Sequence, residues 1–278
     1  MSPARSLLLG AVACAACGRE APGGRASAAD VTARIGSLVA VVGSGSIEAP
    51  DSIAAGWTRI RLVAVERGHN LIVMRIDSTG TAAGERLRAA LDTARATPAG
   101  ALSLGGPEGP NRLGDTSEVI VRLAPGRHLL VCLMRNRDGH RHTSEGEWHE
   151  LLVTGDAMPA GEPVATVAVT MLDFAFAGPA VWAQGDHLVR AANDGAQDHL
   201  FILHRLNDGV TVKEWLDSER PGQLSQRVGG LARTGPGEVA YFPATLSTGT
   251  YVLVCLIPDP ASGRPHAELG MFREIQVQ

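Results

Sequence analysis

Short apolar runs bounded by glycine and proline recur along most of this chain. Each run either alternates apolar and polar positions or is continuously apolar and rich in β-branched residues, which predicts strands. The runs are residues 58–65, 69–76, 117–123, 128–134, 164–174, 187–192, 199–206, 238–242 and 250–257. Residues 84–96 and 211–219 instead predict short helices inserted between strands. Many short strands joined by turns predict an all-β chain of Greek-key sandwiches.

The second half of the sequence repeats the first. The segment GHNLIVMRI, which begins at Gly68, matches DHLFILHRL from Asp198, and LAPGRHLLVCL from Leu123 matches LSTGTYVLVCL from Leu246. A pair of glycines lies between these segments in each copy, at 105–106 and at 229–230. A repeat of this length is a domain duplication rather than a solenoid unit. We therefore expect two tandem sandwiches, residues 37–156 and 163–278, with short inserted helices.

The composition agrees with this expectation and excludes one class of partner. The chain has 278 residues, 45% of them hydrophobic, with 33 glycines and 16 prolines, so it can bury a core and make many turns. The net charge is −4, and no stripe of basic residues is present. Nucleic acid is therefore not an expected partner.

The N-terminus has the pattern of an export signal. MSPAR is followed by an apolar run, residues 7–16, which is too short to span a bilayer as a permanent helix. The run ends in Ala15-Ala16-Cys17, which resembles a bacterial lipobox in which the cysteine receives lipid; Cys14 is a second candidate. An ordinary cleaved signal is the alternative. We expect a signal over 1–17, a flexible tether over 18–36, and an exported protein held at the membrane of the cell envelope by lipid on Cys17.

Two of the four cysteines therefore belong to the signal, which leaves Cys132 and Cys255 to explain. A disulfide between them is not expected, because both fall at interior strand ends of separate sandwiches. A disulfide requires Cα atoms within about 7 Å of each other.

The neighbourhood of Cys255 predicts a metal site instead. Cys255 follows a predicted strand, and a loop then leads to His266 and to Met271, which follows a glycine. His199 begins an earlier predicted strand. Two histidines, one cysteine and a weakly bound methionine form the donor set of blue-copper sites, because imidazole and thiolate together suit both Cu(I) and Cu(II).

This arrangement resembles the cupredoxin family, which includes plastocyanin, azurin, sulfocyanin and the copper-containing nitrite reductases. The shared pattern is Gly-x-Tyr-x-x-x-Cys, a variable loop, and His-x4-Met with glycine before methionine. It is matched here by Gly249, Tyr251, Cys255, His266, Gly270 and Met271. The resemblance implies one copper ion with His199, Cys255 and His266 as equatorial ligands and Met271 as the axial ligand.

Two features depart from the family pattern or compete with it. Ten residues separate Cys255 from His266, more than in most small electron carriers of the family. His204 competes with His199 as the upstream ligand, but the first copy has Met74 at the place of His204 and His69 at the place of His199. We therefore prefer His199.

The first copy retains His69 and Cys132. Aligning Gly146 with Gly270 places His142 on His266 and Glu147 on Met271. A carboxylate in the axial position would favour Cu(II) and lower its reduction potential, or shift the selectivity toward zinc. His140 and His149 are further imidazoles nearby. Two interpretations stay open: a second, chemically different metal site, and a site that has lost its metal and left a solvated histidine cluster.

Three functions fit these features. The leading hypothesis is a one-electron carrier with a redox protein as its partner in the cell envelope. The second is a copper-binding or delivery lipoprotein that works with a copper donor or acceptor. The third is a metal-free interaction module whose glycine-rich connections contact a partner. An enzyme is less expected, because multicopper oxidases and nitrite reductases need a further copper centre, and Val254 and Leu256 flank Cys255 where a trinuclear signature has histidines.

Overall fold

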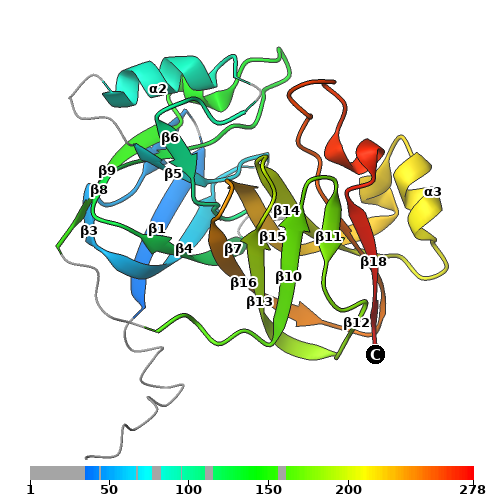
Figure 1. The fold of residues 1–278 in the computed structure, drawn as a ribbon. Helices are drawn as coiled ribbons and strands as arrows, with labels where there is room; N and C mark the ends of the chain where they lie inside the picture. The colour runs from blue at the N-terminus through cyan, green and yellow to red at the C-terminus, as the bar shows by residue number, and fades with distance from the viewer. Residues whose placement is uncertain are drawn as a thin grey trace, which may run out of the picture.

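The computed structural model describes residues 35–43, 45–66, 68–76, 83–94, 96–109, 115–155 and 161–278 (Figure 1). The predicted signal, both of its cysteines and nearly all of the predicted tether lie outside the described residues. Within the described residues, no helix is both long enough and apolar enough to cross a membrane.

The first half of the chain contains nine strands, one helix and one 3₁₀ turn in the described residues. They are β1 (Gly36–Gly43), β2 (Ser46–Glu48), β3 (Ser52–Ala54), β4 (Gly56–Ala64), β5 (Ile72–Ile76), α2 (Ala83–Leu91), β6 (Ala101–Ser103), β7 (Thr116–Leu123), β8 (Gly126–Val131), η1 (His142–Glu145) and β9 (Trp148–Thr154).

The second half repeats this order and adds one further 3₁₀ turn, η2. Its elements are β10 (Val167–Leu172), β11 (Ala175–Ala177), β12 (Val181–Trp182), β13 (Gly185–Asn193), β14 (His199–Leu206), α3 (Val212–Asp217), η2 (Pro221–Gln223), β15 (Ser225–Thr234), β16 (Val239–Leu246), β17 (Gly249–Val254), η3 (His266–Leu269) and β18 (Phe272–Val277).

The strands form three sheets in two layers. One sheet of eight strands, in the order β11-β10-β13-β16-β7-β4-β1-β2, runs through both halves. Two sheets of five strands pack against it, β3-β9-β8-β5-β6 in the first half and β12-β18-β17-β14-β15 in the second. Each strand has the same neighbours as its counterpart in the other half. The all-β architecture of two tandem sandwiches is therefore confirmed.

The two halves join through equivalent strands. In the eight-stranded sheet β7 pairs antiparallel with its own counterpart β16, with Ile120 opposite Tyr241. In the other layer, the chain just after β6 pairs antiparallel with β15 at Leu104↔Thr234 and Pro107↔Leu231. At both places an element pairs antiparallel with its own counterpart. The two halves are therefore related by an approximate two-fold axis.

The repeated glycine pairs have a structural cause at this junction. A Cβ atom on Gly106 would lie 2.1 Å from the carbonyl oxygen of Leu71, and one on Gly230 would lie 2.3 Å from that of Phe201. No side chain fits at either distance, so glycine is required for the backbones to approach. Leu71 and Phe201 stand at corresponding positions of the two halves.

Several elements differ in extent from the prediction. The expected strand 69–76 begins at Ile72, and the backbone N–H of Leu71, just before it, donates to the carbonyl of Pro107. The predicted helix 84–96 ends earlier, at Leu91. The helix expected over 211–219 covers Val212–Asp217, and Thr211 caps it in a capping box with Glu214. The predicted domain limits, 156 and 163, border residues 156–160, which lie outside the described residues, and so they remain predictions.

Candidate metal centres

The ends of three elements bring the predicted donors of the second half together. His199 begins β14, Cys255 follows the last residue of β17, and His266 begins η3. The antiparallel pairing of β14 with β17, with Ile202 opposite Val254, places the start of one strand beside the end of the other. The sheet itself therefore sets the separation of His199 and Cys255.

The three side chains point at one another in the core. The Nδ1 atoms of His199 and His266 are 3.2 Å apart, and Cys255 Sγ lies 3.5 Å from His266 Nδ1. All three residues are fully buried, and one donor atom from each lies within 4.8 Å of the others. Donor atoms that are each about 2.0–2.3 Å from a shared metal ion lie at such distances from one another.

The long loop between Cys255 and His266 folds outward and returns. Pro258 pairs with Pro265 in an isolated bridge at the base of the excursion. The backbone N–H of His266 then donates to the carbonyl of Ile257 at 2.9 Å, and that of Ala267 donates to the carbonyl of Cys255 at 2.8 Å. The extra residues therefore do not displace His266 from Cys255.

Met271 is fully buried and is tied by its backbone to two of these residues. Its N–H donates to the carbonyl of His266 at 2.9 Å, and its carbonyl accepts from the N–H of Cys255 at 3.1 Å. Gly270, with φ of 108°, makes the left-handed turn that permits both bonds.

The far side of each imidazole contacts an oxygen atom. His199 Nε2 lies 3.2 Å from Asp173 Oδ1, and His266 Nε2 lies 3.1 Å from Gln197 Oε1. A ring nitrogen that donates its proton to such an oxygen leaves the other nitrogen as a lone-pair donor. Both Nδ1 atoms, which face Cys255, are therefore set up to bind a metal. Neither Asp173 nor Gln197 was predicted from the sequence, and only the position of Gln197, two residues before His199, could have indicated one of them.

Burial shifts the pKa values of these donors. It raises the pKa of the Cys255 thiol to about 11, although the backbone N–H groups of Leu200 and Ile257 act in the opposite direction. It also lowers the pKa of His199 and of His266. The imidazoles are therefore held neutral, and a metal ion that binds here must displace the thiol proton.

His204, the competing upstream candidate, lies on the other face of its strand. It packs against the ring of Trp215 with 5.1 Å between ring centroids, and its Nδ1 is 3.2 Å from Ser225 Oγ. The adjacent residue Leu203 belongs instead to the central core with Cys255. The structure thus brings His199, and not His204, to Cys255.

The structure also brings together the four residues singled out in the first half. His69 Nδ1 lies 2.8 Å from Glu147 Oε2 and 3.2 Å from His142 Nδ1. His142 Nδ1 lies 3.1 Å from Glu147 Oε2 and 3.6 Å from Cys132 Sγ. Donor atoms of all four residues are within 4.8 Å of one another. Burial raises the pKa of the Cys132 thiol, as it does for Cys255.

The other two histidines of this region do not join the group. His140 is exposed on the loop, and His149 Nε2 lies 3.2 Å from the carbonyl of Pro50. Both cysteines of the described residues are free and buried. The disulfide that the sequence argued against is thus not formed.

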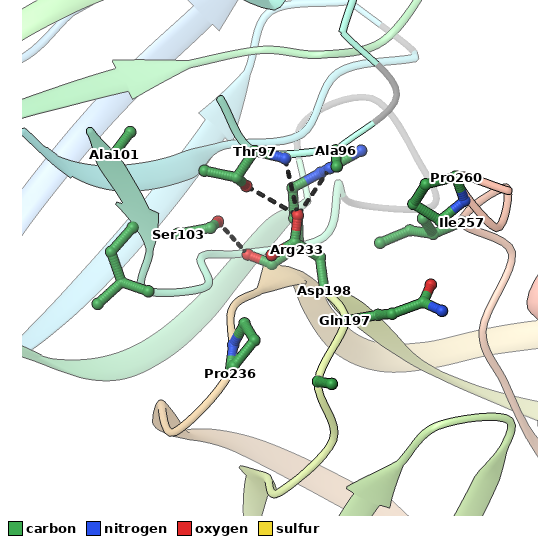
Figure 2. Close-up of a pocket in the computed structure, with 12 residues that line it drawn as sticks. Ala96, Thr97, Ala101, Ser103, Gln197, Asp198, Arg233, Pro236, Ile257 and Pro260 are labelled. Carbon is green, nitrogen blue, oxygen red and sulfur yellow. Dashed lines mark hydrogen bonds and ion pairs between the residues drawn. The ribbon is translucent and has the colours of Figure 1, made fainter. Parts of the chain in front are cut away.

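A polar network at the junction holds the segment that leads to His199 (Figure 2). The carboxylate of Asp198 accepts bonds from the backbone N–H of Thr97 at 3.0 Å and from its hydroxyl at 2.8 Å, and it pairs with Arg233 at 2.9 Å. Ser103 Oγ donates to the carbonyl of Arg233 at 2.6 Å. Two residues of the first half therefore contact the network that positions His199 in the second.

The chain is similar to several solved structures, among them one named as a "blue" copper protein and one named as a copper nitrite reductase. Reduced auracyanin from Roseiflexus castenholzii is 21% identical, covers 40% of this chain and 94% of its own, and gives a TM-score of 0.30. Auracyanin A, a "blue" copper protein from Chloroflexus aurantiacus, is 17% identical over 42% and 98%, with a TM-score of 0.30. The copper nitrite reductase of Nitrosomonas europaea is 14% identical over 87% and 93%, with a TM-score of 0.25.

The fold is cupredoxin-like. No protein-family model matches the sequence, and no curated protein does. Because the identities and TM-scores are low, these similarities say nothing about activity or ligands. Each cupredoxin-like half contains one group of candidate metal donors. The group consists of a histidine before or at the start of one strand, a cysteine after another strand, and a histidine on a 3₁₀ turn.

Proposed function

We propose that the second half holds one copper ion on His199, Cys255 and His266, with Met271 as a weaker axial ligand, and that the protein transfers single electrons in the cell envelope. The observation that carries this proposal is the convergence of two imidazole Nδ1 atoms and one thiol in a fully buried site. Copper would supply the one-electron redox change. The protein residues would hold a geometry between the preferences of Cu(I) and Cu(II).

The rigidity of the site supports electron transfer. His199 and Cys255 are fixed by the ladder between β14 and β17, and His266 and Met271 are fixed by backbone hydrogen bonds to Cys255 and to each other. Donors held in this way move little when the metal changes its charge, which keeps the reorganisation energy of electron transfer low.

Burial favours retention of the metal over its delivery. Ligand exchange with a copper acceptor needs an open ligand position, whereas all three donor residues here are fully buried and Gln197 covers the outer nitrogen of His266. The expected partner is therefore a redox protein that exchanges electrons and leaves the copper in place.

The test is the visible spectrum of the copper-loaded, oxidised protein. We expect an intense band near about 600 nm from thiolate-to-copper charge transfer. Cys255→Ser should abolish the band, whereas Cys132→Ser, the matched change in the other half, should leave it intact. A protein that binds no copper, or whose band depends on Cys132 and not on Cys255, would contradict the proposal.

Voltammetry separates the carrier from the delivery protein. A carrier gives a reversible Cu(II)/Cu(I) couple and keeps its copper in the presence of a Cu(I) chelator. Rapid loss of copper to the chelator, with no reversible couple, would support delivery instead. A metal-free protein that still binds a partner after His199→Ala would support the interaction module.

We also propose that the chain is exported and anchored by lipid on Cys17. The support is the short apolar run that ends in Ala15-Ala16-Cys17. Cells that express the full chain and are fed labelled palmitate should label it. Cys17→Ala should remove the label, and Cys14→Ala should leave it unchanged. Labelling that depends on Cys14 alone, or that is absent, would contradict this assignment.

A further inference from the structure

Glu147 occupies the same backbone position as Met271. Its N–H donates to the carbonyl of His142 at 3.0 Å, and its carbonyl accepts from the N–H of Cys132 at 3.2 Å. Met271 makes the same two bonds with His266 and Cys255. The preceding glycine has φ of 109° in the first half and 108° in the second. The two halves therefore present different side chains from one shared framework.

The first half consequently has a complete set of four strong donors. Three donor atoms, His69 Nδ1, His142 Nδ1 and Glu147 Oε2, are 2.8–3.2 Å apart, and Cys132 Sγ lies 3.6 and 3.9 Å from the two nitrogens. Four donors placed tetrahedrally at about 2.0–2.3 Å from a metal ion are separated from one another by about 3.3–3.6 Å. The observed donor–donor distances lie on both sides of this range.

Hydrogen bonds to Glu147 can hold this arrangement without a metal, and a bound cation can replace the protons that make them. The Nδ1 atoms of both histidines face the same Glu147 oxygen, and they lie 3.2 Å from each other. If both nitrogens carry protons, both donate to this carboxylate oxygen. If one does not, its lone pair faces the carboxylate. A cation at the centre satisfies all four donors at once.

The charges of the two groups select different ions. With neutral imidazoles, Cys132 and Glu147 give the first group two negative charges, which neutralise a divalent cation. Cys255 alone gives the second group one negative charge among its donors, which neutralises Cu(I). Among the donor residues of the second group, Asp173 contacts only His199, at its outer nitrogen. The side chain of Asp173 is about one-third exposed, so water screens its charge. Net charge in a buried site is costly, and each group therefore favours the ion that it neutralises.

We propose that His69, Cys132, His142 and Glu147 form a closed, four-coordinate site for a divalent cation. This cation keeps its charge, whereas copper in the second half would change between Cu(I) and Cu(II). The side chains of His69 and Glu147 are each 3% exposed and that of His142 is 12% exposed, so four protein donors surround the site and leave little room for a substrate. Such a closed site acts in structure rather than in catalysis. Binding of a divalent cation by the first group does not depend on copper binding in the second half.

The test uses the full chain with Cys255→Ser, so that only the first group contains a thiolate. Titration of the metal-free protein with Co(II) should give one equivalent of binding, with a thiolate charge-transfer band and the intense visible bands of tetrahedral Co(II). Zn(II) should then displace the Co(II). Glu147→Gln removes one donor charge at nearly constant shape and should weaken Zn(II) binding by about 100-fold or more. Glu145→Gln, two residues earlier at the end of η1 and outside the group, should leave the affinity unchanged.

A converse change tests the charge argument. With Cys255→Ser in place, Glu147→Met should turn the first group into the donor set of the second, so that copper-loaded protein gains a band near about 600 nm. Circular dichroism of the parent and of each variant shows whether the fold is retained. The absence of Co(II) and Zn(II) binding in the folded parent would overturn the proposal. Equal Zn(II) affinity in the parent and in Glu147→Gln would also overturn it. So would copper that binds to the first group and changes reversibly between Cu(II) and Cu(I) at the reduction potential of the second group.

Discussion

At the scale of single residues, the two halves differ most at one position. Glu147 and Met271 share their backbone hydrogen bonds and differ only in the donor atom they present. The alignment of Gly146 with Gly270 was enough to predict this equivalence from the sequence, because a left-handed glycine fixes the turn in both halves. The contacts of Asp173 and Gln197 with the histidine rings could not be predicted, because they depend on how distant loops fold over the site.

Replacing Met271 tests its axial role. Met271→Leu removes a weak donor that stabilises Cu(II), so the reduction potential should rise while the visible band persists. Met271→Glu should lower the potential and weaken the band. Voltammetry and absorption of the copper-loaded variants measure both effects. A potential that is the same in all three proteins would show that Met271 does not touch the metal.

His204 gives the protein a pH-dependent stability that is independent of the metal. Burial, and then the charge of Arg227, lowers the pKa of His204 to about 4 from an ordinary value of 6.5. Below about pH 6.5 the unfolded chain therefore takes up a proton that the folded chain does not, and stability falls as the pH drops toward 4. His204→Gln should reduce this loss by about 1–3 kcal/mol, measured by urea unfolding at pH 7 and pH 4.5. An unchanged pH dependence would show that another group causes the loss.

At the scale of secondary-structure elements, the periodicity predicted most interior strands to within a few residues. β14 covers the predicted 199–206, and both inserted helices form. The short edge strands β2, β3, β11 and β12 were missed, because two or three residues carry no detectable period. The long strands β1, β9 and β15 were also missed. In β15 the two glycines interrupt the apolar pattern: a Cβ on Gly229 would meet the ring of Phe242, and one on Gly230 would meet the carbonyl of Phe201.

The close backbone approach at Gly230 predicts a large effect for a small change. Gly230→Ala would place Cβ 2.3 Å from the carbonyl oxygen of Phe201, in a backbone conformation with φ of 158°. The strands must separate to relieve this contact, so the free energy of unfolding should fall by about 2–4 kcal/mol. Gly222→Ala, where no atom lies within 4 Å, should change it by about 0.5 kcal/mol at most. Equal effects of the two changes in urea unfolding would refute the assigned role of Gly230.

At the scale of the whole molecule, the repeat predicted two sandwiches but not the way they join. In the eight-stranded sheet, and in the bridges between β15 and the chain just after β6, an element pairs with its own counterpart. Nothing in the hydrophobic pattern of one strand specifies that partner. The buried pair Asp198–Arg233 was likewise not predicted. It lies at this junction, where the backbone N–H of Thr97 in the first half donates to Asp198, the residue before His199.

Breaking that pair should affect both stability and the metal site. Asp198→Asn removes the carboxylate that pairs with Arg233 in a site where both side chains are 9% exposed, which costs about 3–5 kcal/mol. Lys213→Gln removes a pair in which both side chains are exposed and should cost less than about 0.5 kcal/mol. Chemical denaturation of both variants, with copper affinity as the second measurement, tests this. A small loss of stability and unchanged copper affinity in Asp198→Asn would mean that the junction does not position His199.

The central claim is that the second half binds copper through the thiolate of Cys255 and two imidazoles. X-ray absorption of the copper-loaded Cys132→Ser variant tests it most directly, because that variant has no other cysteine in the described residues. We expect one short sulfur neighbour and two nitrogen neighbours around each copper ion. A copper ion surrounded by nitrogen and oxygen alone would contradict it.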